Sequence, residues 1–311
     1  MDYPLIFITG PTAAGKSRLA LALAEKIGAE IISCDSMLFY RQINILNSKP
    51  TPLQRQRIRH HMIDIISVEE EYDVFRYQQE VKNIILPRPR KRFIVCGGSG
   101  LYLKALLDGI FVGAGKDEKI RQRLRKEAEE KSTEHLYRKL EKIDALSAQK
   151  ISPSDLRRII RALEVYYISG RPLSLKKKEA EGLWGKVPMV IYGLLWPRPL
   201  LYARIEKRVE DMFEEGAVRE VESLAGITLS RTASGLIGIK EIRKFLEKKL
   251  SWEEAKEEVK KNTRHLAKKQ MTWFRKEKRI RWLKMEDENS YREALEVIIS
   301  EASSKNGQKT D

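Results

Sequence analysis

Residues 10–17 read Gly10-Pro11-Thr12-Ala13-Ala14-Gly15-Lys16-Ser17 and fit the phosphate-binding loop pattern G-x-x-x-x-G-K-[ST] at every position. The glycines let the backbone curl around an anion, so that successive N–H groups face inward at the positive end of the next helix. The Lys16 ammonium adds charge for phosphate oxygens, and the Ser17 hydroxyl can reach a divalent cation. An apolar run precedes the loop at residues 5–8, and an Ala- and Leu-rich helix follows it to about Ile27. We interpret this segment as a polyphosphate site rather than a glycine-rich turn without a ligand.

Composition bounds the class of protein and its partners. The chain has 311 residues, enough for two domains, and its 60 Lys and Arg against 44 Asp and Glu give a formal net charge of +16. This balance favours a polyanionic partner, nucleic acid before an anionic membrane, although a basic proteome or a thermophile rich in Lys and Glu would also explain it. No segment has the roughly 20 apolar residues of a membrane span, and we expect no secretory signal. The two cysteines, Cys34 and Cys96, are too few for a disulfide framework or zinc site, which fits the cytoplasm.

The order of apolar runs predicts the fold. Strand-like runs at residues 30–33, 93–96 and 189–195 alternate with helical patterns, as in a parallel sheet covered on both faces. Residues 116–186 are charged and helical in pattern, without a convincing strand. The sequence therefore predicts an α/β fold. A P-loop three-layer core with a parallel sheet would comprise residues 1–115 and 187–302, mostly helical after residue 200. A helical insertion domain would comprise residues 116–186, and residues 303–311 would form a disordered tail.

One acidic residue is well placed to meet the loop. Asp35 follows the run at residues 30–33, and ligands of open parallel sheets lie beyond the carboxyl ends of strands. The run at 93–96 ends in Gly97-Gly98, without the second acid that an ordinary phosphate-loop NTPase uses around magnesium. Asp35 could be a metal-shell ligand, a general base or the cap of a turn. Arg204 and Arg208 lie four residues apart on one helix face and could both neutralise phosphates.

Two basic stretches could bind RNA. Residues 264–284 contain nine Lys or Arg and one acid, with Trp273, Phe274 and Trp282 interleaved. Charges of this kind meet phosphates and rings stack on unpaired bases, although Phe274 and Leu266 on a helix more often face a core. A second cluster, at residues 157–161, has the same two interpretations.

Together these segments resemble one family, the tRNA dimethylallyltransferases. The resemblance runs in order from residue 5 to about residue 283 and is carried by residues 10–17, 35–41, 49–50, 97–102, 154–165, 204–208 and 264–274. It implies transfer of a dimethylallyl group from dimethylallyl diphosphate to N6 of adenosine 37 in tRNAs that read codons beginning with U. It also implies release of pyrophosphate, a need for Mg²⁺, recognition of the anticodon stem-loop and a monomeric protein. With two cysteines the chain lacks the zinc finger of eukaryotic members, which indicates the bacterial type.

The resemblance also implies residue roles. Asp35 would take the N6 proton or orient the amine, Arg208 would stabilise the departing pyrophosphate, and Ser17 would be catalytic and bind the metal. The whole loop at residues 10–17 would bind the diphosphate. The positions that match regions contacting tRNA are Asp35, Ser36, Met37, Leu38, Ser99, Arg121, Arg157, Arg158, Ile159, Ile160, Arg161, Gly238, Ile239 and Lys240.

The chain departs from the family pattern at three places. Ser99 stands where Thr is usual, and Ile239 stands where Tyr is common. Residues 44–48 read Asn-Ile-Leu-Asn-Ser where Asp-Ile-Gly-Thr-Ala is usual. None of these belongs to the predicted catalytic set.

Three alternative functions stay open. An adenylate isopentenyltransferase would use a free nucleotide, but a small acceptor needs no long basic helical region. A small-molecule or nucleoside kinase would turn over ATP, with Asp35 acting on a hydroxyl acceptor. An RNA-binding NTPase switch would be expected to carry the missing second acid. Prenyl transfer cleaves no γ-phosphoryl group, so it is the function that best explains that missing acid.

Overall fold

The computed structural model describes residues 3–111 and 115–304. The chain divides into two compact units, one from Met1–Lys104 with Trp184–Asp311 and the other from Ala105–Leu183. The second unit starts earlier than the predicted residue 116, because its two connecting segments bind each other. The Leu183 N–H donates to the Leu106 carbonyl at 2.8 Å, and Gly182 lies directly against the backbone of Leu107.

A six-stranded parallel sheet in the order β3-β2-β4-β1-β5-β6 forms the centre of the first unit. Every residue of β1 is buried, so the strand before the phosphate loop lies in the middle of the sheet. The strands are β1 (Leu5–Thr9), β2 (Glu30–Ser33), β3 (His60–His61), β4 (Phe93–Gly97), β5 (Met189–Leu195) and β6 (Ile280–Lys284).

The chain after residue 200 is mostly helical, as expected, but it also contains strand β6, which the sequence did not predict. It pairs with β5 at one edge of the sheet, where Ile280 is buried and Arg281 is exposed. Charged residues interrupt the apolar pattern of such an edge strand, so a search for continuous apolar runs misses it.

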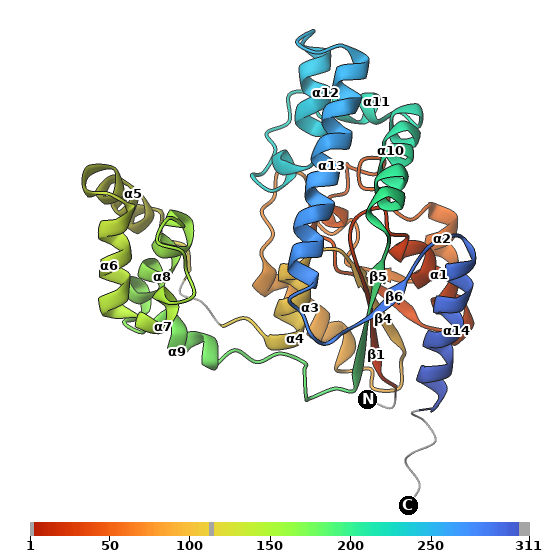
Figure 1. Cartoon of the computed structure of the whole chain (residues 1–311), viewed down its shortest axis with the longest axis horizontal. Helices are drawn as coiled ribbons and strands as arrows, with labels where there is room; N and C mark the ends of the chain where they lie inside the picture. The colour runs from red at the N-terminus through yellow and green to blue at the C-terminus, as the bar shows by residue number, and fades with distance from the viewer. Residues whose placement is uncertain (1–2, 112–114, 305–311) are drawn as a thin grey trace, which may run out of the picture. The chain divides into compact units, whose positions relative to one another are not determined.

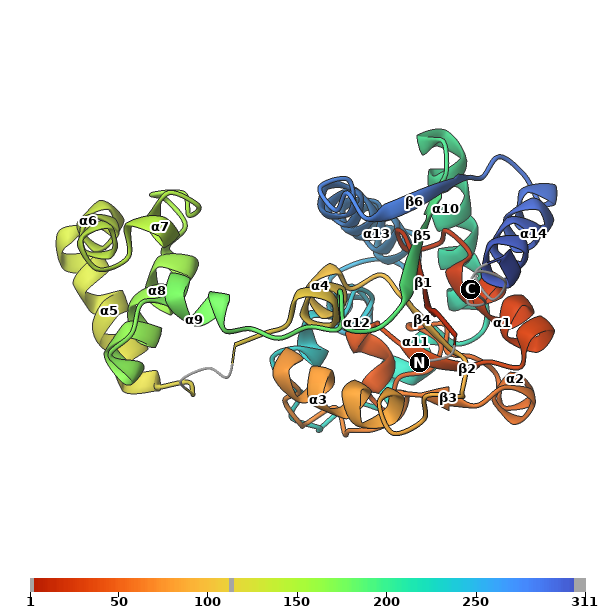
Figure 2. The same cartoon turned by 90° about the horizontal axis from the view of Figure 1, so that it is seen from below.

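Helices cover both faces of this sheet, as predicted for a three-layer core. Figure 2 shows α1 and α14 on one side of the sheet and α3 and α4 on the other. These helices and the shorter ones nearby are α1 (Lys16–Ile27), α2 (Pro52–Arg57), α3 (Val74–Ile85), α4 (Gly100–Asp108) and α14 (Asn289–Ser304), with the 3₁₀ turn η1 (Ser36–Phe39). Helix α14 includes residues 303 and 304 of the predicted tail, and residues 305–311 lie outside the described residues.

A second group of helices extends beyond the carboxyl ends of the strands (Figure 1). Helix α13 packs against α10 and α12. The members are α10 (Arg198–Glu214), α11 (Ala217–Glu222), α12 (Ile239–Leu246) and α13 (Trp252–Phe274), with the turn η2 (Ala233–Gly235).

All the regular secondary structure in the described residues of the second unit is helical. Its small core includes Leu124, Leu136 and Leu163, and Asp155 caps α8 by accepting a hydrogen bond from the Arg158 N–H. The helices are α5 (Glu118–Lys131), α6 (Thr133–Ile143), α7 (Ala145–Ala148), α8 (Leu156–Ser169) and α9 (Leu173–Lys178). In neither unit is any described helix long and apolar enough to cross a bilayer.

Candidate active site

The phosphate loop is held in shape by side chains that bind its carbonyl oxygens. The Trp196 indole and the Tyr291 hydroxyl both donate to the Ala14 carbonyl at 3.0 Å. The Arg204 Nε donates to the Ala13 carbonyl at 3.0 Å, while its Nη2 donates to Tyr291. With these carbonyls fixed by protein donors, the loop can turn its N–H groups toward an anion.

The two loop glycines are required by close contacts as well as by backbone angles. Gly15 has a φ of 83°, and a Cβ atom there would lie 1.9 Å from the Tyr291 hydroxyl. Gly10 has a φ of 141°, and its Cβ would lie 3.0 Å from the Leu194 carbonyl oxygen on β5. The glycine argument made from the sequence therefore holds at both positions.

Three charged side chains meet beside the loop. Arg208 Nη1 donates to Thr12 Oγ1 at 2.5 Å, and Lys16 Nζ donates to the Pro11 carbonyl at 2.7 Å. Burial lowers the pKa of both Lys16 and Arg208, and the nearby charge of Asp35 acts on both in the opposite direction. One site therefore contains two cations that can face phosphate oxygens and one carboxylate.

Asp35 lies just beyond the end of β2 and caps the turn η1. Its Oδ1 accepts a hydrogen bond from the Met37 N–H at 3.2 Å, so the capping role considered from the sequence is present. Within the part of the chain that the structure describes, no hydrogen bond to a protein group occupies Oδ2. The same carboxylate can therefore cap the turn with one oxygen and take a proton from an acceptor substrate with the other.

Ser17 is exposed at the start of α1, where it can reach a cation on a bound phosphate. Burial raises the pKa of the neighbouring Cys96 thiol to about 11, with a hydrogen bond from Ser17 acting in the opposite direction. Across residues 3–111 and 115–304, no three His, Cys, Asp or Glu side chains gather as a metal site. The Ser17 hydroxyl could hold a divalent cation together with phosphate oxygens and water.

Arg204 and Gln270 differ from what the sequence suggested. Arg204 does not face the phosphates alongside Arg208, because its guanidinium supports the outer side of the loop. Gln270 on α13 was not singled out, yet its Oε1 accepts from the Thr12 N–H at 2.8 Å. Its position three residues before Trp273 and four before the buried Phe274 is the signal that could have found it, since such residues share a helix face.

Comparisons with known proteins identify the family. A model of the family described as IPP transferase matches residues 38–277. The chain belongs to the IPP transferase family.

Relatives of this IPP transferase cover nearly the whole chain. The tRNA dimethylallyltransferase of Pelotomaculum thermopropionicum is 45% identical over 290 residues, 91% of each chain. That of Carboxydothermus hydrogenoformans is 41% identical over 306 residues, 97% of this chain and 98% of the relative. Both confirm the resemblance found in the sequence.

Solved structures agree on the fold. The tRNA isopentenylpyrophosphate transferase of Bacillus halodurans has a TM-score of 0.69 at 32% identity and covers 97% of this chain and 98% of its own. A eukaryotic dimethylallyltransferase acting on tRNA has a TM-score of 0.80 at 30% identity and covers 96% of this chain and 80% of its own. The P-loop α/β fold predicted from the sequence is confirmed.

The candidate acceptor residues of this IPP transferase lie in η1 and next to it. The Ser36 N–H lies 3.4 Å from Ser99 Oγ, which joins the turn after β4 to the segment that carries Asp35. Asn47 Nδ2 donates to the Met37 carbonyl at 2.5 Å, so the atypical segment 44–48 supports η1.

The two segments that depart from the family pattern, residues 44–48 and residues 238–240, touch each other. Glu220 accepts hydrogen bonds from three successive N–H groups, those of residues 44–46. Gly238 has a φ of 106° and lies against the Leu46 side chain. Ile239 is buried and Lys240 is exposed, so of this pair only Lys240 presents a side chain to solvent.

The insertion arginines divide into two groups. Arg121 Nε and Nη2 donate to the buried Glu164 at 2.8 and 3.0 Å, and Arg161 Nη1 donates to it at 2.6 Å. Arg157 and Arg158 are exposed. Ile159 and Ile160 pack in the core of this unit.

The C-terminal basic stretch is likewise mixed. Phe274 is fully buried, as expected from its helical spacing, whereas Leu266 is 38% exposed, contrary to that expectation. Lys268 and Lys269 are exposed on α13, and the stretch then continues into strand β6.

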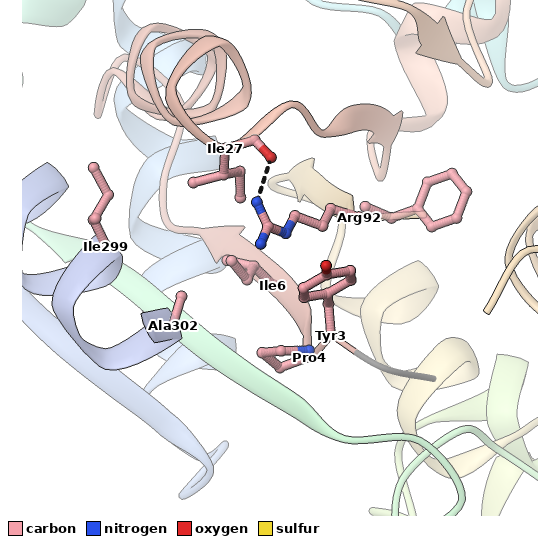
Figure 3. A pocket seen from close by; sticks show the side chains of 8 residues that line it. Tyr3, Pro4, Ile6, Ile27, Arg92, Ile299 and Ala302 are labelled. Carbon is pink, nitrogen blue, oxygen red and sulfur yellow. Dashed lines mark hydrogen bonds between the residues drawn. The ribbon is translucent and has the colours of Figure 1, made fainter. Parts of the chain in front are cut away.

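A small cavity of about 50 Å³ lies at the other end of the sheet (Figure 3). Tyr3 and Pro4, just before β1, line it together with Ile27 at the end of α1. Arg92 closes part of it by donating to the Ile27 carbonyl at 2.8 Å and stacking over the Tyr3 ring. Because it is at the amino end of β1, away from the phosphate loop, we do not assign it to the active site.

Proposed function

We propose that this protein transfers a dimethylallyl group from dimethylallyl diphosphate to N6 of adenosine 37 in tRNAs that read codons beginning with U, and releases pyrophosphate. The observation that carries the proposal is the hydrogen bond of Arg208 to Thr12 in a phosphate loop whose neighbouring strand β4 ends in glycine, with Asp35 following the adjacent strand β2. The relatives named tRNA dimethylallyltransferase support it.

In this reaction the bond between the allylic carbon and the diphosphate oxygen breaks, and a bond from that carbon to N6 forms. The departing diphosphate gains negative charge, which the loop N–H groups, Lys16 and Arg208 would stabilise in a partly buried site. An amine conjugated to a purine ring is a weak nucleophile. Asp35 Oδ2 would accept the N6 proton as the new bond forms.

Mg²⁺ is the divalent ion we propose for this site. Bound with the donor, it would neutralise part of the diphosphate charge, with Ser17 as the protein ligand. This choice rests on the exposed Ser17 hydroxyl at the start of α1.

The acceptor base must leave its stack before it can reach Asp35. We propose that exposed cations hold the anticodon stem-loop while this happens, with Lys268 and Lys269 on α13 and Arg157 and Arg158 on α8. Ser36, Met37, Leu38 and Ser99 would line the path of the base, and Lys240 would add a phosphate contact. Arg121, Arg161, Ile159, Ile160, Gly238 and Ile239 would act by shaping these surfaces. The protein would work as a cytoplasmic monomer.

Labelled dimethylallyl diphosphate distinguishes this function from its alternatives. The protein is incubated with Mg²⁺, the labelled donor and unmodified tRNA, the same tRNA with guanosine at position 37, or AMP. We expect label only in the tRNA that carries adenosine 37. Label only in AMP would identify an adenylate isopentenyltransferase. In a parallel incubation with ATP, turnover of ATP without label transfer would identify a kinase or NTPase.

A further inference from the structure

The Gln270 side chain connects two loops of the site by two hydrogen bonds. Its Oε1 accepts from the Thr12 N–H at 2.8 Å, and its Nε2 donates to the Gly98 carbonyl at 3.1 Å. The two partners fix the orientation of the amide, since an N–H can only donate and a carbonyl can only accept. A side chain that donates and accepts in this way can be Gln but not Glu.

Each end of this bridge leads to a reacting group. On one side, the Thr12 hydroxyl accepts the hydrogen bond of Arg208 at 2.5 Å. On the other side, Gly98 adjoins Ser99, whose Oγ lies 3.4 Å from the Ser36 N–H and whose own N–H donates to the Cys34 carbonyl at 3.2 Å. Asp35 lies between Cys34 and Ser36. Gln270 therefore joins the segment that holds the leaving group to the segment that holds the base.

The packing around the bridge leaves little freedom. A Cβ atom on Gly98 would lie 2.6 Å from Gln270 Nε2, and one on Gly100 would lie 2.4 Å from the Trp273 ring. A Cβ on Gly97 would lie 2.1 Å from the Cys34 carbonyl oxygen. Helix α13 is thus seated directly on the turn after β4, with the amide at the contact.

We propose that Gln270 is a positioning residue that sets the separation between Arg208, which faces the leaving group, and Asp35, which takes the proton. This inference rests on the function proposed above. Gln270 itself touches neither reacting atom. Because an error of about 1 Å in such a separation can cost about 100-fold in rate, the bridge acts on the chemical step and leaves substrate affinity nearly unchanged.

Two variants separate the two hydrogen bonds. Gln270→Met keeps the length of the side chain and loses both bonds, whereas Gln270→Glu keeps the acceptor for Thr12 and loses the donor to Gly98. Thr272→Val is the control, because Thr272 is exposed on the same helix. Circular dichroism establishes that each variant is folded. Single-turnover rates are measured with saturating donor and tRNA, and KM for each substrate is measured in the steady state.

We expect Gln270→Met to lower the single-turnover rate by about 100-fold, with KM for donor and tRNA changed by less than about 3-fold. Hydrogen exchange of the Thr12 amide should accelerate in Gln270→Met more than in Gln270→Glu. The single-turnover rate of Gln270→Glu should also fall, because the second carboxylate oxygen repels the Gly98 carbonyl.

Other outcomes overturn the inference. Rates within about 2-fold of wild type in both variants would do so, as would a loss confined to KM. If Gln270→Met is unfolded, the rate and KM of Gln270→Glu decide. An inactive wild-type protein would refute the proposed function instead, and the Thr12 exchange rates would still test the bridge.

Discussion

Asp35 combines a structural and a chemical capacity in one carboxylate. Its Oδ1 caps η1 through the Met37 N–H, and its charge acts on both Lys16 and Arg208. A variant at this position must therefore separate loss of the cap from loss of the base.

Asp35→Asn makes that separation, because the amide oxygen can still accept the Met37 N–H but cannot take a proton. We expect Asp35→Asn and Asp35→Ala both to lower the turnover number by at least about 100-fold, with tRNA affinity within about 2-fold of wild type. Steady-state kinetics and filter binding measure the two quantities. If Asp35→Asn were nearly as active as wild type, the cap alone would explain the residue.

Single residues were predictable where the chemistry is local. Residues 10–17 specify their ligand class by spacing alone, and the structure places Arg208 and Asp35 beside them. Trp196 and Tyr291 could not be found in this way, because they reach the Ala14 carbonyl from the residue after β5 and from α14 only after the chain has folded. Arg204 and Arg208 lie four residues apart on the same face of α10. Their spacing alone does not show which of the two faces the interior of the loop, because packing decides it.

Among the elements, α13 has the widest role. It packs on α10 and α12, and it contacts the turn after β4 through Trp273 over Gly100. Helical periodicity predicted the buried side of this helix at Phe274 but not the residues it faces, since a single sequence holds no information on pairing between distant segments. Edge strand β6 was not predicted for the same reason, since its pairing with β5 cannot be read from a single sequence.

Gly100→Ala tests the packing of α13 against this turn. The added methyl would lie 2.4 Å from the Trp273 ring, so we expect the free energy of unfolding to fall by about 1–3 kcal/mol. Gly235→Ala is the control, because a Cβ there meets nothing within 4 Å. Urea unfolding followed by tryptophan fluorescence measures both variants. Equal stability of the two would show that the contact relaxes without cost.

For the molecule as a whole, the second unit carries its own buried ion pairs. Burial alone would raise the pKa of Glu164, but hydrogen bonds from Arg121 and Arg161 outweigh it and hold that pKa below the ordinary value. A carboxylate with a lowered pKa stabilises the folded state above its unfolded pKa, and this stabilisation is lost as the pH falls through the folded pKa.

Glu164→Gln should therefore lower the free energy of unfolding of this unit by about 3 kcal/mol at pH 7, because two guanidinium groups lose their partner. The difference between variant and wild type should shrink below about pH 4. Hydrogen exchange in α5, α6 and α8 measures it. Glu134→Gln is the control, since the Glu134–Arg138 pair is exposed and contributes little. A difference that persists unchanged at pH 3 would contradict the assignment.

The RNA binding that we propose for the same unit should depend on Arg157 and Arg158. Changing both to Ala should weaken tRNA binding and reduce the slope of log K against log salt by about 1.5 to 2, because each phosphate contact releases counterions. Arg138→Ala with Lys126→Ala removes the same charge from exposed positions of this unit. Titrations at several salt concentrations test this. Equal slopes for the two double variants would mean that Arg157 and Arg158 form an ordinary solvated surface.

The contact between Tyr291 and the phosphate loop has a consequence for synthesis of the protein. The loop leaves the ribosome before the hydroxyl that binds Ala14 and fills the space beside Gly15, because that hydroxyl comes 277 residues later. A nascent chain that ends before residue 291 lacks this support, so we expect it to hold no ordered donor site. We therefore expect donor binding only in chains that include the first turn of α14, which is made after the sheet and the helical unit.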